Sequence, residues 1–499
     1  MLVRSRPWLL QIASVLLLSV SSVPSFAAER PSLEFHLTYD RKIGVESFTG
    51  RVYIILDSPD AEDLPEEIDW FRPQPVLAVD VKNWKPGETV VIAKSALAQP
   101  PFSKIEAKQY SIHAVMDLDK GAASFTRADG NCYCKPIVRK VDPNAGDAIK
   151  VVIDQVYKEK PVAESETIKL VEIRSKLLSD FHGKPVSLRA SVSLPKSFQQ
   201  RTKDQYPVVY DIPGFGGDHR AITYATHSWT EVDGVEFIHV VLDPNCRTGH
   251  HLFVDSETNG PYGKALIEEL IPHIEKQYRG QGAGASRFLM GHSSGGWTSL
   301  WLQVTYADFF GGCWATAPDE VDFRDFQRTN IYEKGANLFV DEAGKPRPMA
   351  RDIGKGPIYN KAFSDVETVI GHGGQLGSYE ANFSPRSSDG IPRLLWDRKT
   401  GKIDPEIAKH WEKYDIRLVL EGNWDKISSK LKGKLHVYVG SKDTFFLEEA
   451  VGMLKESQKK LKSDAVIDII PDKNHATLMN DDMHKRIKEE MVKKYRQDK

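Results

Sequence analysis

The residues with the clearest chemical potential form a serine turn flanked by glycines. Ser293 is the third residue of Gly291-His-Ser-Ser-Gly295, which follows an apolar segment at 288–290 and precedes a helical pattern with apolar residues at 297, 300, 301 and 304. In a G-x-S-x-G turn between a strand and a helix, the serine occupies a strained backbone position that exposes its hydroxyl, and the positive helix end lies beside it. The pattern predicts a nucleophilic serine; a glycine- and serine-rich turn without chemistry is the alternative.

An acid and a histidine follow in the order that such a serine requires. The alternating, β-branched segment 434–440 predicts a strand, and Asp443 comes shortly after it. The next predicted strand, 465–470, is followed by His475. We predict that His475 is the general base and that Asp443 holds its imidazole in the required tautomer.

Other carboxylates are weaker candidates for the orienting acid. Asp468 and Asp472 lie too close to His475 in the sequence, and Asp319 and Asp322 follow an earlier strand. Taken singly, Asp443 would be an ordinary turn aspartate and His475 an ordinary loop histidine. The predicted triad therefore depends on the order of its members and on their positions after consecutive strands.

Hydrolysis of an acyl bond also requires donors for the carbonyl oxygen, on which negative charge develops. We predict that the backbone N–H of Ser294, directly after the nucleophile, is one of them. The second is expected in the loop Pro213-Gly-Phe-Gly-Gly217 after a predicted strand at 206–212, and we place it at the N–H of Phe215. A phosphate-binding loop is the competing interpretation, but the Gly-Lys-Ser/Thr sequence of such loops does not follow these glycines.

From about Leu170 to its C-terminus, the chain resembles the putative esterase family of α/β-hydrolases, which includes feruloyl and enterochelin esterases, S-formylglutathione hydrolases and mycolyltransferases. The matching motifs are Ile212–Gly217, Asn259–Gly263, Gly291–Gly296, Gly440–Asp443 and Asn474-His475. The resemblance implies the α/β-hydrolase fold and the triad, and it leaves the substrate open because relatives act on very different acyl groups. The sequence departs at Pro213-Gly214, where many relatives have His-Gly, and in a long segment between the sixth and seventh strands.

Composition and the N-terminus restrict the compartment and the partners. The 499 residues carry a formal net charge of −2, so neither nucleic acid nor an anionic membrane is an expected partner. The first 27 residues resemble a secretory signal peptide, because Arg4 and Arg6 precede an apolar core at 8–20 and Ser25-Phe-Ala27 fits a cleavage site. We expect a secreted or periplasmic protein without a membrane span after signal removal; an uncleaved anchor is the alternative.

The chain is too long for one ordinary core, and its pattern of predicted strands and helices changes near residue 164. From 28 to 163, short β-rich segments alternate with Pro, Gly and Asp clusters, which predicts a β-sandwich-like domain. From 164 to 499, two antiparallel strands precede alternating strands and helices, which predicts a mostly parallel sheet with helices on both faces. The predicted fold is an α/β-hydrolase domain preceded by an N-terminal β-sandwich-like domain.

The polar, turn-rich segment from about 319 to 410 is longer than an ordinary strand-to-helix connection. It contains Tyr379, Phe383 and Trp396, and we predict a lid-like insertion over the triad. Trp396 and Arg393 are then the candidates for substrate binding. A surface insertion without a role is the alternative.

Neither a metal nor another cofactor is predicted. Asp243, Cys246, His250 and His251 share one loop, but adjacent histidines point in divergent directions, so a loop that borders the active site is favoured over a metal site. The four cysteines are too few for a disulfide framework, and whether any of them pair is left open.

The leading hypothesis is a secreted serine hydrolase that cleaves small-molecule or glycan-linked carboxylic esters through an acyl-enzyme. An acyltransferase would use the same triad with a sugar or lipid acceptor in place of water. A non-catalytic binding protein on a hydrolase scaffold is a third class, disfavoured by the intact Ser293, Asp443 and His475. A peptidase could use the same residues, but nothing identifies an amide substrate.

Overall fold

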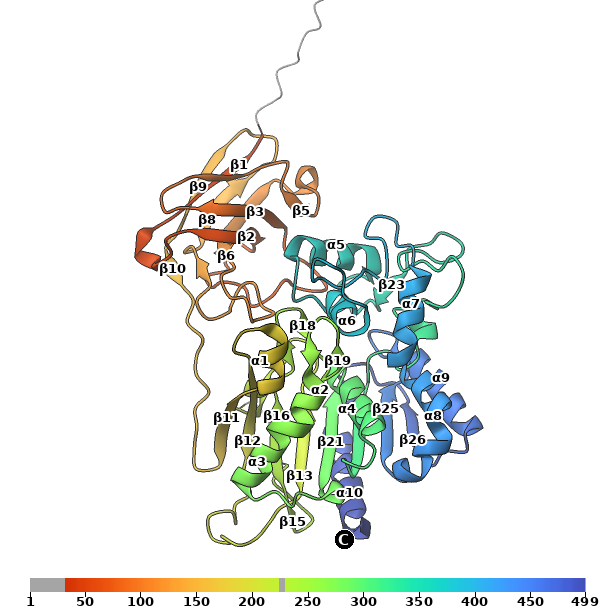
Figure 1. Cartoon of the computed structure of the whole chain (residues 1–499). Coiled ribbons are helices and arrows are strands. Elements are labelled where there is room, and N and C mark those ends of the chain that lie inside the picture. Colours follow the sequence, from red (N-terminus) through yellow and green to blue (C-terminus); the bar gives the residue numbers. More distant parts are fainter. Residues whose placement is uncertain (1–31, 224–228, 499) are drawn as a thin grey trace, which may run out of the picture.

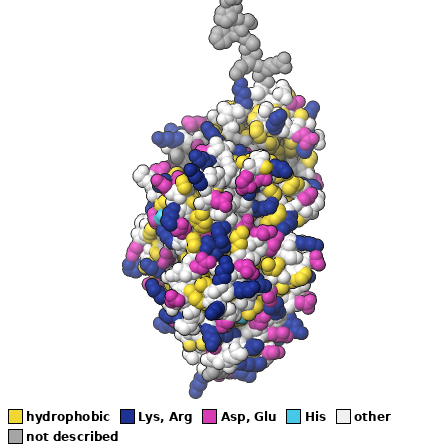
Figure 2. Space-filling model, turned by 90° about the vertical axis from the view of Figure 1, so that its right-hand side faces the viewer, with side chains coloured by type: hydrophobic (Ala, Val, Ile, Leu, Met, Phe, Trp, Pro, Cys, Tyr) yellow, Lys and Arg dark blue, Asp and Glu magenta, His cyan; other side chains and the backbone are white. Residues whose placement is uncertain are grey.

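The computed structural model describes residues 32–223 and 229–498, and Figure 1 shows how they are arranged. The predicted signal peptide, residues 1–27, lies outside the described residues. Among the helices that are described, none combines the length and the apolar character that a membrane crossing requires. Basic and acidic side chains are interspersed on the face shown in Figure 2, in keeping with the net charge of −2.

Two β-sheets pack face to face in the N-terminal domain. The smaller sheet has the strand order β4-β1-β9, and the larger has the order β10-β7-β6-β2-β3-β5, with β8 paired to β6. Leu37, Val52, Ile112 and Val151 are fully buried in the core between the sheets. The strands are β1 Glu34–Tyr39, β2 Phe48–Asp57, β3 Val76–Trp84, β4 Val90–Ile92, β5 Leu97–Gln99, β6 Lys108–Met116, β7 Cys132–Tyr133, β8 Ile137–Val141, β9 Ala148–Ile153 and β10 Gln155–Val156.

Strand β2 is buried on both faces, which accounts for its continuous apolar run Val52–Leu56. Alternate residues of this run point into the core between the sheets. Tyr53 and Ile55 face the other way and pack with Val366 and Val369 of helix α5 (Asn360–Ile370), which belongs to the second domain. The two domains therefore share apolar surface.

An eight-stranded sheet with the order β11-β12-β16-β13-β21-β22-β25-β26 forms the centre of the second domain. Strand β12 is antiparallel to both of its neighbours, and the remaining pairs are parallel. The strands are β11 Ile168–Arg174, β12 Ser187–Ser193, β13 Val208–Ile212, β16 Ile238–Leu242, β21 Arg287–His292, β22 Gly312–Thr316, β25 Leu435–Gly440 and β26 Val466–Ile470.

Helices cover both faces of this sheet, which confirms the predicted α/β-hydrolase architecture. In Figure 1, α3, α4 and α8 lie in front of the sheet and α10 lies behind it. Trp314 and Tyr438 reach the rear helix, where both donate hydrogen bonds to Glu490. The helices are α1 Lys176–His182, α2 Tyr262–Ala265, α3 Ile271–Tyr278, α4 Ser294–Thr305, α8 Ile416–Leu431, α9 Leu447–Lys460 and α10 Asp481–Asp498.

The predicted insertion follows β22 and contains three helices and a small hairpin. Helices α5 and α6 lie between the N-terminal sheets and the carboxyl ends of the parallel strands (Figure 1). Its elements are β23 Pro348–Ala350, β24 Ile358–Tyr359, α5, α6 Gln375–Phe383 and α7 Pro405–Trp411. The short strands outside it are β14 Glu231–Val232, β15 Val235–Glu236, β17 Asn245–Cys246, β18 Gly249–His250, β19 Asp255–Ser256 and β20 Gly260–Pro261.

Candidate active site

Ser293 occupies a strained turn between β21 and α4. Its backbone has φ 59° and ψ −126°, a region that residues with a side chain rarely adopt. The flanking glycines make the turn possible, because an ideal Cβ at Gly295 would lie 1.8 Å from the carbonyl oxygen of Ile212. The Ser293 N–H donates to Thr316 O at 3.0 Å, which fixes the turn against the neighbouring strand. This is the geometry that presents a serine hydroxyl above the sheet.

The structure brings His475 and Asp443 together at the carboxyl ends of β26 and β25. Nδ1 of His475 lies 2.8 Å from Oδ2 of Asp443, and the Asp443 side chain is fully buried. The other carboxylate oxygen accepts the backbone N–H of Phe445 at 2.9 Å. A buried carboxylate that accepts two hydrogen bonds in this way holds an imidazole in one orientation and one tautomer.

His292 packs beside this pair without competing for the proton. Its ring centroid lies 4.5 Å from that of His475. Burial, followed by the charge of His475, lowers the pKa of His292 to about 3. Because His292 is neutral near pH 7, it does not repel a protonated His475.

The Ser293 hydroxyl donates a hydrogen bond to Asp319 rather than to His475 in this conformation. Oδ1 of Asp319 lies 3.3 Å from Ser293 Oγ, while its Oδ2 accepts from Ser294 Oγ at 2.5 Å and from the Tyr379 hydroxyl at 2.7 Å. Burial raises the pKa of Asp319, and the hydrogen bonds and the charge of His475 oppose this. Sequence reasoning considered Asp319 only as a weaker orienting acid and missed its contact with the nucleophile.

The predicted oxyanion loop lies against the serine turn. An ideal Cβ at Gly214 would lie 3.2 Å from the Cβ of Ser293, so only glycine fits this approach without displacement. Pro213 O accepts a hydrogen bond at 2.9 Å from Nε2 of His250, whose Nδ1 accepts from the N–H of Leu252 at 3.1 Å. These bonds require the neutral Nε2–H tautomer, and burial lowers the pKa of His250 to about 4. His250 therefore positions the loop that contains Phe215.

Helix α4 begins at Ser294, and its first internal bond runs from the N–H of Trp297 to the carbonyl of Ser293. The N–H groups of the first helical turn have no partner within the helix. The N–H of Ser294 therefore has no partner within the helix, which its predicted role as an oxyanion donor requires.

The histidines of the loop after β16 have structural partners. Asp243 pairs with His219 at 3.1 Å, and the ring of His251 stacks on Tyr262 with centroids 3.7 Å apart. Within residues 32–223 and 229–498, no group of three or more potential metal ligands comes together. All four cysteines are free.

The two residues predicted to bind substrate are not placed to do so. Trp396 is only 1% exposed, and its ring is covered by Arg398, with the guanidinium 4.0 Å from the ring centroid. Arg393 lies at the surface beside Asp404 and Glu406, 3.5 Å from each. The structure corrects this prediction, because Trp396 belongs to the core of the insertion and Arg393 to a surface ion pair. Within the insertion, Asp319 contacts the serine turn directly, and Tyr379 donates a hydrogen bond to Asp319.

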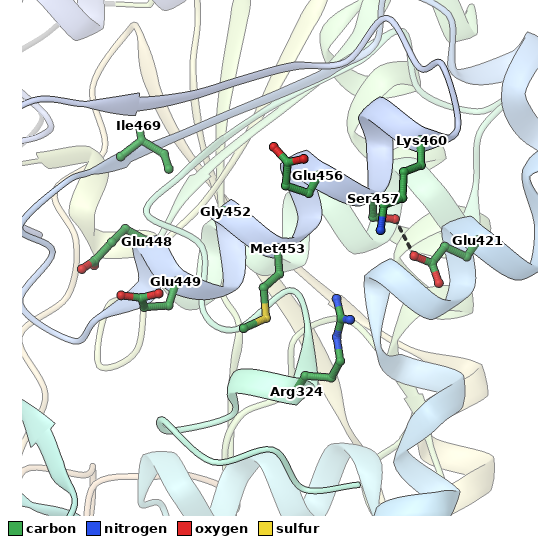
Figure 3. Close-up of a pocket in the computed structure, with 10 residues that line it drawn as sticks. All are labelled: Arg324, Glu421, Glu448, Glu449, Gly452, Met453, Glu456, Ser457, Lys460 and Ile469. Atoms are coloured by element: carbon green, nitrogen blue, oxygen red, sulfur yellow. Dashed lines mark hydrogen bonds between the residues drawn. The ribbon is translucent and has the colours of Figure 1, made fainter. Parts of the chain in front are cut away.

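A separate groove of about 580 Å³ does not include the candidate triad (Figure 3). It is lined mainly by α9 and contains several carboxylates and two basic residues, Arg324 and Lys460. Its serine, Ser457, donates to Glu421 at 2.6 Å. No histidine is among the described residues that line this groove, so it lacks an imidazole base that could activate Ser457, and it is not the candidate active site.

The family model described as "Putative esterase" matches residues 185–477. A ferulic acid esterase structure is 16% identical, with a TM-score of 0.40, and the match covers 66% of this chain and 99% of that chain. An S-formylglutathione hydrolase from Agrobacterium tumefaciens is 14% identical, with a TM-score of 0.40, covering 65% and 94%. A fluorophosphonate-binding serine hydrolase from Staphylococcus aureus is 14% identical, with a TM-score of 0.41, covering 65% and 98%. No curated protein matches the chain.

Proposed function

Since the chain belongs to the putative esterase family and is a carboxylic-ester hydrolase, we propose that Ser293, His475 and Asp443 are its catalytic residues. The observation that carries this proposal is the 2.8 Å contact of His475 Nδ1 with the buried Asp443, beside the strained turn of Ser293. With Nδ1 engaged by the carboxylate, Nε2 of His475 is left to take a proton from the nucleophile.

In the proposed acylation step, the Ser293 hydroxyl turns from Asp319 to His475 and attacks the ester carbonyl as Nε2 accepts its proton. Negative charge on the carbonyl oxygen is stabilised by the N–H groups of Ser294 and Phe215, and each such donor contributes about 3 kcal/mol to the transition state. His475 then protonates the departing alcohol, and the acyl group stays on Ser293.

In the deacylation step, water attacks the acyl-enzyme while His475 accepts its proton. The same donors stabilise the second tetrahedral intermediate, and collapse returns the proton to Ser293 and releases the acid. Asp443 stabilises the imidazolium in both steps. We propose further that the enzyme works outside the cytoplasm, on the basis of the basic start and apolar core of its first 27 residues.

Site-specific labelling with a fluorophosphonate tests the assignment of the nucleophile. The reagent should modify Ser293 in the wild-type chain, as located by peptide mass spectrometry, and Ser293→Ala should lose both labelling and ester hydrolysis. Ser294→Ala is the matched control, because it keeps the backbone N–H and should still be labelled at residue 293. Labelling of Ser294, or undiminished hydrolysis by Ser293→Ala, would overturn the proposal.

A further inference from the structure

The loop between β2 and β3, residues 58–75, extends from the N-terminal domain to the candidate active site. Leu64 and Ile68 anchor it in apolar contacts shared by the two domains. The carbonyl of Leu64 accepts from Arg127 Nε at 2.7 Å, and that of Glu66 accepts from Thr126 Oγ1 at 2.6 Å. The loop is therefore held in place by its own domain before it reaches the second one.

A tight turn at Asp69 presents two aromatic residues to the second domain. Oδ1 of Asp69 accepts the N–H groups of Phe71 at 2.7 Å and Arg72 at 3.0 Å. Trp70 and Phe71 are partly exposed, and both pack against the apolar core of the catalytic domain. Lys355 of the insertion lies 3.7 Å from Asp69 and adds a charged contact to this turn.

Trp70 is the centre of an aromatic cluster that borders the proposed catalytic residues. Its ring centroid lies 5.5 Å from that of Phe215 in the oxyanion loop, 5.0 Å from Phe363 of α5 and 6.1 Å from Phe445. The ring of Phe445 in turn meets His475 edge-on, with centroids 4.9 Å apart. Trp70 thus contacts the oxyanion loop, the insertion and the turn after Asp443 at once.

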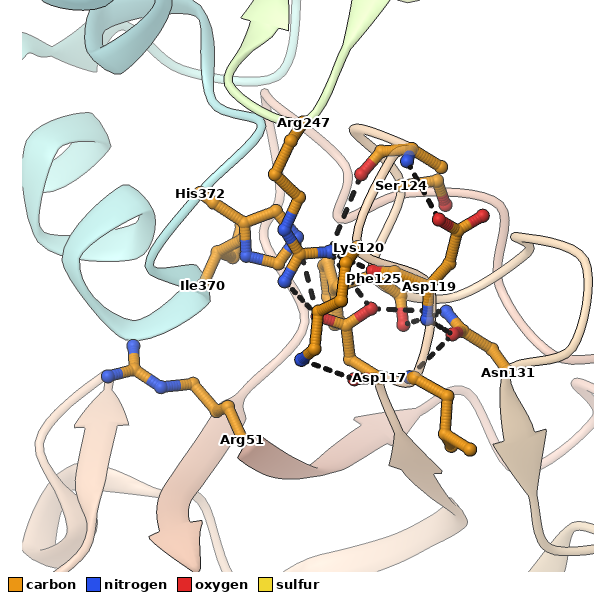
Figure 4. Close-up of polar contacts among 12 residues, drawn as sticks. Arg51, Asp117, Asp119, Lys120, Ser124, Phe125, Asn131, Arg247, Ile370 and His372 are labelled. Atoms are coloured by element: carbon orange, nitrogen blue, oxygen red, sulfur yellow. Dashed lines mark hydrogen bonds and ion pairs between the residues drawn. The ribbon is translucent and has the colours of Figure 1, made fainter. Parts of the chain in front are cut away.

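Polar contacts outside this cluster also hold the two domains together (Figure 4). Arg247, from the connection between β17 and β18, donates to Asp117 Oδ2 at 2.6 Å, and Asp117 is 1% exposed. Arg51 donates to the carbonyl of Val369 at 2.9 Å, and Tyr53 donates to that of Ile370 at 2.6 Å. Trp70 is partly exposed and is separated from His475 by the ring of Phe445, so its exposed part can contact something other than protein.

On the basis of the proposed function, we propose that the substrate site is built by both domains and that Trp70 binds an aryl group of the ester. Trp70 already forms T-shaped pairs with Phe363 and Phe445 and a tilted pair with Phe215. A flat substrate ring can form a further pair of this kind, and such pairs add to the free energy of simple apolar burial. Glu67 Oε2 lies 3.8 Å from the position of an ideal Cβ at Gly216. A carboxylate this near to the oxyanion loop favours a neutral aryl group over an anionic one.

The test compares kcat/KM for methyl 3-phenylpropanoate, benzyl acetate and methyl acetate, which differ in whether and where they carry a ring. In Trp70→Ala, kcat/KM for at least one aryl ester should fall at least tenfold further than that for methyl acetate, mainly through KM. Trp70→Phe keeps a ring and should restore most of the preference. Phe181→Ala, which removes a 39% exposed aromatic side chain of α1, is the control and should leave all three values unchanged.

Trp70→Leu keeps apolar contacts in the cluster and serves if the alanine variant does not fold. An unchanged ratio of aryl to methyl ester activity in a folded variant would overturn the inference. So would an equal fall for all three esters, because that indicates a purely structural role. Fluorophosphonate labelling of Ser293 separates this failure from failure of the proposed function: a labelled, active enzyme with an unchanged ratio refutes only the role of Trp70.

Discussion

Replacing Asp443 by asparagine separates the proposed orienting acid from the other carboxylate near the nucleophile. Asp443 accepts two hydrogen bonds, one from His475 Nδ1 at 2.8 Å and one from the Phe445 N–H at 2.9 Å. The backbone donor at Phe445 cannot change its role, so it selects the carbonyl oxygen of the new side-chain amide. The amide NH₂ must then face His475, which forces the tautomer with its proton on Nε2. That tautomer cannot accept a proton from Ser293.

An enzyme with the amide turned the other way is also less active, and the hydrogen bonds of Asp443 allow the loss to be estimated. Turning the amide leaves a buried donor facing the Phe445 N–H, at a cost of about 1–3 kcal/mol, which makes this form roughly 5 to 150 times rarer. In that form a neutral oxygen replaces the carboxylate that stabilises the imidazolium. Together these effects predict that Asp443→Asn lowers kcat by about 10³- to 10⁴-fold, or about 4–5.5 kcal/mol.

Stopped-flow acylation by p-nitrophenyl acetate measures this loss directly, with Ser293→Ala as the background. Asp319→Asn is the matched comparison, because Asp319 contacts Ser293 and Tyr379 but is not paired with His475 in this conformation. We expect it to lose far less activity than Asp443→Asn. The reasoning is refuted if Asp443→Asn loses less than about tenfold while Asp319→Asn loses about a thousandfold, since Asp319 would then be the orienting acid.

Two further changes test the serine turn and the buried acid next to Asp319. Gly295→Ala should not give folded protein, because its Cβ would lie 1.8 Å from Ile212 O. The measurement is the soluble yield, compared with that of Gly422→Ala, whose Cβ meets nothing within 4 Å. A folded, active Gly295→Ala enzyme would contradict the prediction. Burial, followed by the charge of Asp319, raises the pKa of Glu320 from 4.5 to about 8. The folded chain therefore binds this proton more tightly than the unfolded chain, so the free energy of unfolding falls as pH rises through that interval. Glu320→Gln should lack this fall, a difference of up to about 5 kcal/mol at pH 9. Urea midpoints that change in parallel with pH in both proteins would argue against it.

The elements that carry the candidate triad could be predicted because local patterns determine them. The alternating segments at 434–440 and 465–470 form β25 and β26, which differ from the predicted bounds by one residue at the start. The glycines around Ser293 were informative for the same reason, since their lack of a side chain is needed within the turn itself. Sequence order then placed Asp443 and His475 at neighbouring strand ends.

What could not be predicted depends on contacts between distant segments. Asp319 reaches Ser293 because β22 lies beside β21 and because Ala317 adopts a positive φ of 39°. Trp396 was expected over the active site, but a polar, turn-rich segment can also enclose its own aromatic core, and composition does not distinguish the two. No sequence pattern indicates that Trp70 lies near the candidate active site, because its position depends on how two domains pack.

The double burial of β2 has a consequence for synthesis on the ribosome. Tyr53 and its apolar neighbours emerge early, but their partner Ile370 follows 317 residues later. At typical elongation rates of about 5–20 residues per second, that delay is on the order of tens of seconds. During this time the outer face of an otherwise completed sheet stays open to water, and any other chain with an exposed apolar surface can bind it. The outer face of β2 therefore gains its apolar cover only when α5 is made.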